Sequence, residues 1–223
     1  MIEQLSIIPI LLFSVIIHEM AHGWMALRLG DTTARDRGRL TLNPIPHIDL
    51  VGSVLVPLIS LAAAGHVFIA WAKPVPINPA NFRNPRRDSV LVSAVGPLSN
   101  FILALLCGFA VIAVGLARAG LMEQIPWLPD RLTGFLLSML YGGMYINVAL
   151  GVFNLLPLPP LDGSHILAAM LPPPAAAVYM RIGFFGILVV LFAMRIPFVN
   201  SAFGALIGGA FSPFRALVDM FLN

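Results

Sequence analysis

The chain has 223 residues, of which 59% are hydrophobic and only 10% are charged. A soluble domain carries about 25% charged residues, so this composition excludes an ordinary soluble protein and predicts a polytopic membrane protein. The formal net charge of +3 comes almost wholly from arginine. In a membrane protein such charges affect orientation and bind lipid headgroups, so we predict no nucleic-acid partner. The length suits a single membrane domain, residues 1–223, and the one cysteine, Cys107, excludes a disulfide framework.

The first apolar segment, residues 5–29, contains the sequence His18-Glu19-Met20-Ala21-His22. Composition alone would produce an HExxH pattern in such a chain roughly 0.0015 times, so chance is a poor explanation. Two histidines four residues apart lie on one face of a helix and can reach one metal ion. Glu19 is then placed to take a proton from a metal-bound water. Because three ionisable groups in an apolar span are costly unless something compensates them, we predict a metal site here.

The region after this first helix is irregular. Residues 30–39 are polar and rich in arginine, and residues 40–42 (Leu-Thr-Leu) have strand character. Residues 50–72 are apolar again, but glycine and proline interrupt them. Residues 71–79 contain too much proline for a helix and favour extended backbone. We therefore expect a re-entrant, partly extended or β segment between the first helix and the next long one.

Long apolar segments make up most of the remaining chain. Residues 89–117 and 133–156 each predict a spanning helix. After a Pro-Pro-Pro breaker, residues 176–196 can span once more, and residues 200–222 form a weaker helix that either spans or lies in the interface. The predicted fold class is an all-α polytopic membrane protein with about five to six transmembrane helices.

A third metal ligand should lie elsewhere in the chain, because a catalytic zinc usually takes three protein ligands and leaves one position for water. Asp162 is the best candidate, since it directly follows a spanning helix within a proline-rich segment where its side chain can turn inward. The alternative is an ordinary turn aspartate in Leu-Asp-Gly. His47 and His165 are weaker candidates, and His66 suits a core position or a place near the substrate as well as ligation.

Three segments resemble the hallmarks of the site-2 protease family of intramembrane zinc metalloproteases (peptidase M50), in the right order. They are HEMAH at 18–22, GPLSN at 96–100 and NLLPLPPLDG at 154–163. WAKPVPINP at 71–79 resembles a further segment of the compact prokaryotic members, which lack PDZ and CBS domains. The resemblance covers most of a core at residues 5–170, and the C-terminal helices, 176–222, carry none of the motifs.

The resemblance implies one Zn²⁺ ion per chain, held by His18, His22 and Asp162. It also implies that Glu19 is the general base, and that Asn100 and Asn154 line the active site near the scissile peptide or its oxyanion. Either asparagine could instead be a residue that hydrogen-bonds between packed helices.

The three motifs must meet at one depth, which constrains the topology. If the first helix runs from outside to inside, residues 30–88 begin and end on the inside, and residues 50–72 cannot cross once as a simple helix. Residues 30–88 hold six arginines and Lys73, whereas the loop at 118–132 has two arginines. We therefore expect the N-terminus outside and the active site towards the cytosolic side of a prokaryotic inner membrane. The open alternative is that residues 50–72 span and the 96–100 motif works from elsewhere.

The predicted function is intramembrane proteolysis of a transmembrane protein substrate within the lipid bilayer; no oligomeric state is predicted. Residues 40–42 and 73–78 could receive an unwound substrate by edge pairing, or could be structural loops. The main alternative is a polytopic metal-ion transporter, which would more often show repeated ligand pairs. A membrane desaturase would need more histidines than this chain has, and a catalytically dead scaffold would not need Glu19.

Overall fold

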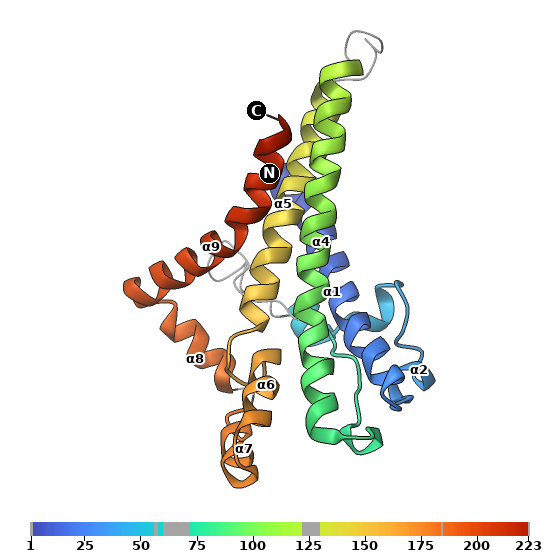
Figure 1. Cartoon of the computed structure of the whole chain (residues 1–223), viewed down its shortest axis with the longest axis vertical. Helices are drawn as coiled ribbons and strands as arrows, with labels where there is room; N and C mark the ends of the chain where they lie inside the picture. The colour runs from blue at the N-terminus through green and yellow to red at the C-terminus, as the bar shows by residue number, and fades with distance from the viewer. Residues whose placement is uncertain (1, 56–57, 60–71, 122–129, 184, 223) are drawn as a thin grey trace.

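The computed structural model describes residues 2–55, 58–59, 72–121, 130–183 and 185–222, and none of these residues forms a strand. Three long helices form the centre of the molecule (Figure 1): α1 (Ile2–Arg28), α4 (Pro85–Leu121) and α5 (Asp130–Asn154). α4 is the longest and packs against both of the others, and α9 (Pro197–Leu222) packs against α4 and α5. The prediction of an all-α fold is confirmed.

Four helices are long and apolar enough to cross a membrane, by length and composition: α1, α4, α5 and α9. The predicted count of five to six is therefore too high for the described residues. The segment 176–196 does not form one helix but is shared between α7 (Pro173–Met180) and α8 (Phe185–Ala193), with Gly183 at φ 50° between them. Helices of eight and nine residues rise only about 12–14 Å, well short of the roughly 30 Å of a hydrocarbon core.

The connection from α1 to α4 is mostly irregular. It includes α2 (Thr33–Asp36), 3₁₀ turns at Ile45–His47 and Pro79–Asn81, and a π-helical turn at Leu50–Leu55. The predicted strand at residues 40–42 is wrong: these residues form a bend. Local hydrogen bonds explain the bend, because Thr41 Oγ1 accepts from the Asn43 N–H and Asn43 Oδ1 accepts from the Ile45 N–H.

Most of the apolar stretch at 50–72 lies outside the described residues, and so does His66. Its re-entrant path therefore stays a prediction. Residues 72–78 are described, and they run as an extended segment that pairs with no strand in the described chain.

An apolar cluster lies where α4, α5 and α9 meet. Met144 of α5 is fully buried and lies beside Gly108 of α4, where an added Cβ would be 3.3 Å from the methionine sulfur. The buried members of this cluster are Ala104, Val111, Ile112, Met144, Val148, Val152, Ile207 and Val218. The cluster fixes α4 against α5, and these two helices also carry asparagines that surround the site described next.

Candidate metal centre

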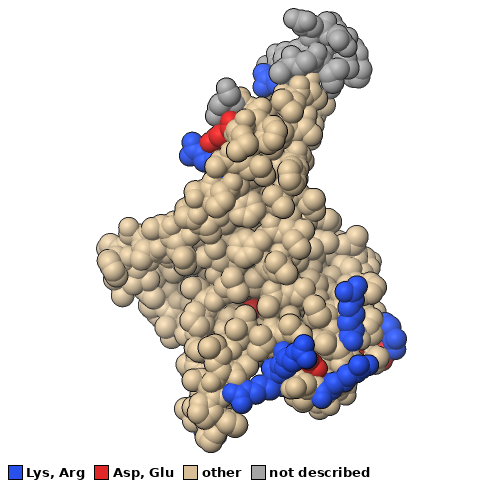
Figure 2. Space-filling model, in the orientation of Figure 1, with Lys and Arg blue, Asp and Glu red and all other residues tan. Residues whose placement is uncertain are grey.

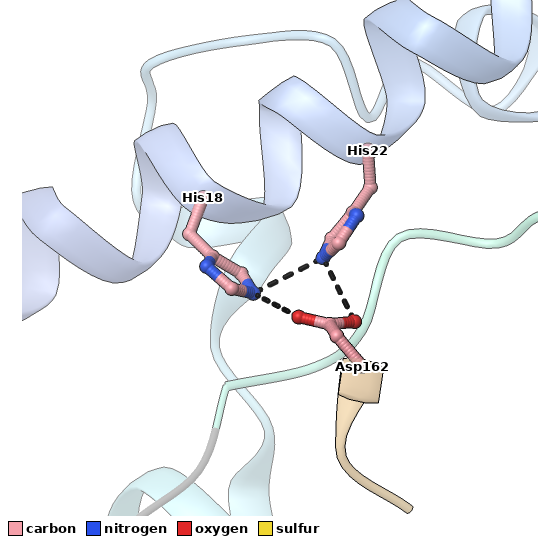
Figure 3. A group of neighbouring side chains, drawn as sticks. All are labelled: His18, His22 and Asp162. Carbon is pink, nitrogen blue, oxygen red and sulfur yellow. Dashed lines mark hydrogen bonds and ion pairs between the residues drawn. The ribbon is translucent and has the colours of Figure 1, made fainter. Parts of the chain in front are cut away.

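Two helices bring three metal-ligating side chains together (Figure 3). His18 and His22 project from the same face of α1, and Asp162 faces them from the first residue of α6 (Asp162–Met170). The two Nε2 atoms are 3.0 Å apart, and the carboxylate oxygens of Asp162 lie 3.1 Å from His18 Nε2 and 3.3 Å from His22 Nε2. The potential ligand atoms all lie within 4.8 Å of one another, so they could share one ion.

The other ring nitrogen of each histidine has a hydrogen-bond acceptor. Nδ1 of His18 donates to Oδ1 of Asn100 over 2.6 Å, and Nδ1 of His22 donates to the carbonyl oxygen of Val92 over 2.7 Å. Since an amide or peptide oxygen only accepts, both Nδ1 atoms carry protons, and the Nε2 atoms of the neutral rings present lone pairs to each other. Histidines that bind metals usually have this arrangement, with the outer nitrogen held by an acceptor.

These three residues fit a zinc ion. Tetrahedral zinc with ligands at about 2.0–2.1 Å separates neighbouring ligand atoms by roughly 3.3 Å, close to the separations found here. With both rings neutral and no cation bound, two lone pairs and a carboxylate face one another in a buried space, which is electrostatically unfavourable. Oδ2 of Asp162 is buried, and apart from Nε2 of His18 at 3.1 Å it has no hydrogen-bond partner in the described part of the chain. Zinc would satisfy all of these groups.

Two glycines make room for the site. A Cβ on Gly96 of α4 would lie 2.4 Å from Nε2 of His22 and 2.8 Å from Cε1 of His18, so only glycine leaves space for both rings. A Cβ on Gly163 would lie 2.2 Å from the backbone oxygen of Leu155, so glycine allows α6 to begin against the end of α5. That close approach places Asp162 opposite α1.

The remaining residues of the GPLSN segment also act locally. Pro97 has no N–H for the carbonyl of Ser93, which interrupts the hydrogen-bond ladder of α4 near the site. The hydroxyl of Ser99 donates to the carbonyl of Gly96 over 2.6 Å. Asn100 then reaches His18 from the next position. The segment therefore forms the wall of the site behind the histidines.

A cavity of about 320 Å³ opens in front of the three residues. The carboxyl group of Glu19 belongs to its lining, which places the predicted base beside the predicted ligands. The lining also includes Val75 and its neighbours in the segment before α4, and Asn154, Asp162 and His165 from the region where α5 ends and α6 begins. The cavity can therefore hold a small chain segment or a water molecule next to Glu19.

The extended segment 72–78 is attached to the rest of the protein along its length. Its middle contacts the site directly, because the N–H of Val75 donates to Oε2 of Glu19 over 2.7 Å. At one end the Lys73 carbonyl accepts from Arg39 over 2.6 Å, and at the other end the Asn78 N–H donates to Asp31 over 2.7 Å. The segment therefore orients Glu19 and forms a fixed wall of the cavity.

Edge pairing along this segment stays a prediction. The N–H groups of Lys73, Val75 and Asn78 already have acceptors, and the prolines at 74 and 76 have none to offer. Among residues 73–78, the groups left for such pairing are carbonyl oxygens and the N–H of Ile77. Residues 40–42, the other segment predicted to pair with a substrate, form the bend described above and not a strand.

The other residues named from the sequence are found in different environments. Asn154 lines the cavity, with its Nδ2 group donating to the Leu150 carbonyl over 3.0 Å. Asn100 is fully buried behind His18 and outside the cavity lining. His165 lies at the cavity wall, and His47 is buried in the loop, where its Nε2 contacts the Thr41 carbonyl at 2.9 Å.

Sequence reasoning missed two buried residues near the site. Nδ2 of Asn100 donates to Oδ1 of Asn147 over 2.9 Å, and Nδ2 of Asn147 donates to Oγ of Ser14, also over 2.9 Å. Polarity could have indicated Asn147 and Ser14, because an amide and a hydroxyl within apolar spans need hydrogen-bond partners. Sequence reasoning also missed the Val92 carbonyl and the Val75 N–H, which are backbone groups and leave no mark in side-chain patterns.

Comparison with known proteins supplies the family. The sequence profile of Peptidase family M50 matches residues 6–192. The chain belongs to peptidase family M50. A relative, YwhC of Bacillus subtilis, provisionally named a zinc metalloprotease, is 38% identical over 197 residues, which are 86% of this chain and 83% of that protein.

Two further M50 relatives carry the same kind of provisional zinc metalloprotease name. Rip2 of Mycolicibacterium smegmatis is 31% identical over 198 residues, 88% of this chain and 69% of that protein. Rip2 of Mycobacterium tuberculosis is 28% identical over 192 residues, 86% of this chain and 67% of that protein. No solved structure matches the chain significantly.

The family and its relatives confirm that this M50 protein is a zinc metalloprotease of the site-2 type. Four apolar helices of spanning length agree with an integral membrane protein. The predictions of the family and of zinc as cofactor are thus confirmed, and nothing in the comparisons supports the metal-transporter alternative.

Proposed function

We propose that this M50 protein acts as a single domain, residues 1–223, and hydrolyses peptide bonds in or near transmembrane helices of membrane-protein substrates. In this proposal His18, His22 and Asp162 hold the zinc, and Glu19 is the general base. The observation that carries it is the convergence of those three side chains beside a cavity that Glu19 also lines. A pure storage or transport site would have no use for a second carboxylate, Glu19, that is not a ligand.

Each residue has a defined task in the proposed reaction. Zinc, when bound, acidifies a water molecule and polarises the scissile carbonyl. Glu19 accepts the proton of the attacking water and later donates it to the leaving amine. The N–H of Val75 holds Glu19 Oε2, which leaves the other carboxylate oxygen to face the water.

Asn154 is the proposed contact to the substrate. Its amide group has two N–H bonds, and only one is needed for the Leu150 carbonyl. The second can donate to the oxyanion that develops on the scissile peptide, in the cavity that both Asn154 and Glu19 line. A transmembrane helix must unwind locally to present that peptide, because helical hydrogen bonds otherwise shield it.

We also propose that the metal centre faces the cytosol. Lys and Arg side chains gather at the end of the molecule where α1 ends and α4 begins (Figure 2). Exposed members of this group are Arg28, Arg35, Arg37, Lys73, Arg83, Arg86 and Arg87. Cytoplasmic segments of membrane proteins carry such an excess. A single cysteine at position 37, in a Cys107→Ala background, should react with an impermeant thiol reagent in inverted inner-membrane vesicles and not in intact cells.

The proposal is tested by cleavage of a transmembrane-helix reporter with purified protein in detergent. The variants are Glu19→Gln and Asp162→Ala, with Asp219→Asn as a control carboxylate that is exposed in α9, and zinc content is determined for each. Wild type and Asp219→Asn should cleave and bind zinc. Glu19→Gln should keep zinc but lose cleavage by a factor of at least about 100, whereas Asp162→Ala should lose both. Equal cleavage by Glu19→Gln and wild type would contradict the mechanism.

A further inference from the structure

A chain of polar side chains leads away from the metal centre into the helix bundle. Asn100 of α4, Asn147 of α5 and Ser14 of α1 are 0%, 2% and 1% exposed. None of them belongs to the lining of the cavity beside Glu19. They therefore cannot contact a substrate that binds in that cavity, and a role in the reaction has to pass through His18.

The direction of the hydrogen bonds is fixed from one end of the chain to the other. Nδ2 of Asn147 donates to Oγ of Ser14 and to the carbonyl of Gly143, each over 2.9 Å. Its Oδ1 is thereby left to accept from Nδ2 of Asn100. Oδ1 of Asn100 is then the only atom of that amide that can face Nδ1 of His18, and it accepts over 2.6 Å.

This direction determines the tautomer of His18. With an obligatory acceptor at Nδ1, the proton stays on Nδ1 and Nε2 offers its lone pair towards Asp162 and His22. If Asn147 were absent, the Asn100 amide could rotate by 180° and present its N–H₂ group to His18. The proton of His18 would then move to Nε2, where it would block ligation.

The two ligand histidines differ in this respect. His22 is held by a backbone carbonyl, Val92, whose orientation is set by α4 itself. His18 depends on a side chain that could rotate. Burying two amides and a hydroxyl in membrane-spanning helices is costly. All three of these groups support His18, the ligand whose hydrogen-bond partner is not fixed by the backbone.

We propose that Asn147, assisted by Ser14, is a positioning residue that acts through Asn100 to keep His18 in its metal-binding tautomer. This inference rests on the proposed zinc-ligand role of His18. Side chains that orient metal-bound histidines typically contribute about 10–100-fold to metal affinity. We expect Asn100→Leu to weaken zinc binding by about 100-fold and Asn147→Leu by about 10-fold. Ser14→Ala, which removes one hydrogen bond at the end of the chain, should have an effect of about threefold.

The test is zinc affinity, measured by competition with a chelator on purified protein in detergent, together with the visible spectrum of the cobalt-loaded protein. Met144→Leu is the matched control, because Met144 is equally buried one turn away on α5 and has no polar contact to lose. The thermal stability of each zinc-free variant shows whether it is folded. Asn147→Leu and Ser14→Ala should remain folded, bind zinc more weakly and change the cobalt spectrum, whereas Met144→Leu should match wild type.

A double variant tests the route of the effect. If Asn147 acts through Asn100, Asn100→Leu with Asn147→Leu should bind zinc no more weakly than Asn100→Leu alone. Additive losses would overturn the inference, and so would wild-type affinity in both Asn147→Leu and Ser14→Ala. Either result would leave the proposed function intact. Wild-type protein that bound no zinc, or a His18→Ala variant with unchanged affinity, would overturn the proposed function itself.

Discussion

Two parts of the α4–α5 contact differ in what holds them together: the polar side chains behind the metal site and the apolar cluster around Met144. Behind the metal site, His18, Asn100 and Asn147 form directional hydrogen bonds between 2.6 and 2.9 Å long that connect α1, α4 and α5. Beside them on the same two helices, Met144 and its neighbours pack α4, α5 and α9 with apolar side chains alone. The same pair of helices thus carries a polar region, whose hydrogen bonds are directional, and an apolar region, whose packing contacts are not.

The difference follows from the solvent. In a bilayer, lipid tails are as apolar as leucine, so an apolar cluster gains packing but little hydrophobic driving force. Apolar contacts can therefore hold helices together without defining the positions of individual atoms. Buried polar groups have no substitute partner in lipid, so their directional hydrogen bonds fix the positions of the groups that they join. We expect changes at the metal site to affect chemistry and changes in the apolar cluster to affect stability.

The largest effect is expected from Gly96→Ala. The new Cβ would lie 2.4 Å from Nε2 of His22, and both histidine rings are hydrogen-bonded to α4, so they cannot move away together. Zinc affinity and reporter cleavage should each fall by at least about 100-fold. Gly142→Ala is the control, because its added Cβ would meet nothing within 4 Å. Near-normal zinc binding by Gly96→Ala would show that the site is looser than described.

Met144→Ala should have the opposite pattern. Truncating a fully buried methionine costs about 2–5 kcal/mol in the free energy of unfolding, and the low end applies where detergent or lipid can fill the gap. The melting temperature should fall, while zinc affinity of the folded protein stays within about twofold of wild type. Met220→Ala, at a 76% exposed position, serves as the control. Loss of zinc without loss of stability would remove the distinction between the two parts.

Acidification should loosen the segment 72–78, which forms a wall of the cavity and is held at its Asn78 end by Asp31. Burial alone would raise the pKa of Asp31, but hydrogen bonds from Thr33, Asn78 and Asn81 outweigh it and lower the pKa below its usual value. A group with a lowered folded-state pKa stabilises the fold above its unfolded pKa of about 4, and this stabilisation is lost as pH falls further. Asp31→Asn should cost about 1–3 kcal/mol at neutral pH. Unfolding measured against pH should show a smaller acid dependence in the variant than in wild type.

The smallest effect is expected at the far end of α9. Nε of Arg215 lies 3.3 Å from Oδ2 of Asp219, and the two side chains are 65% and 46% exposed. Exposed pairs four residues apart contribute about 0.3–0.5 kcal/mol, so Arg215→Gln should change stability by no more than that and leave cleavage unchanged. A large loss of activity in this variant would mean that α9 takes part in catalysis.

The sequence predicted the metal site better than the rest of the fold. HExxH places two imidazoles on one helix face whatever surrounds them, and Asp162 was the best third candidate because it directly follows a spanning helix within a proline-rich segment. Asn147 was missed because a lone amide has no characteristic spacing, and Val75 because its contribution is a backbone N–H. The break near Gly183 was missed because the composition of residues 176–196 is apolar enough for a span, whereas the backbone turns there.

The most direct test of the metal centre is X-ray absorption at the zinc edge of the purified protein, compared between wild type and Asp162→Ala. We expect nitrogen and oxygen ligands at about 2.0–2.2 Å in wild type, including two imidazoles, and loss of most of the zinc signal in Asp162→Ala. A sulfur ligand at about 2.3 Å, which only Cys107 or a methionine could supply, would contradict this centre. An identical spectrum in both proteins would contradict the role of Asp162.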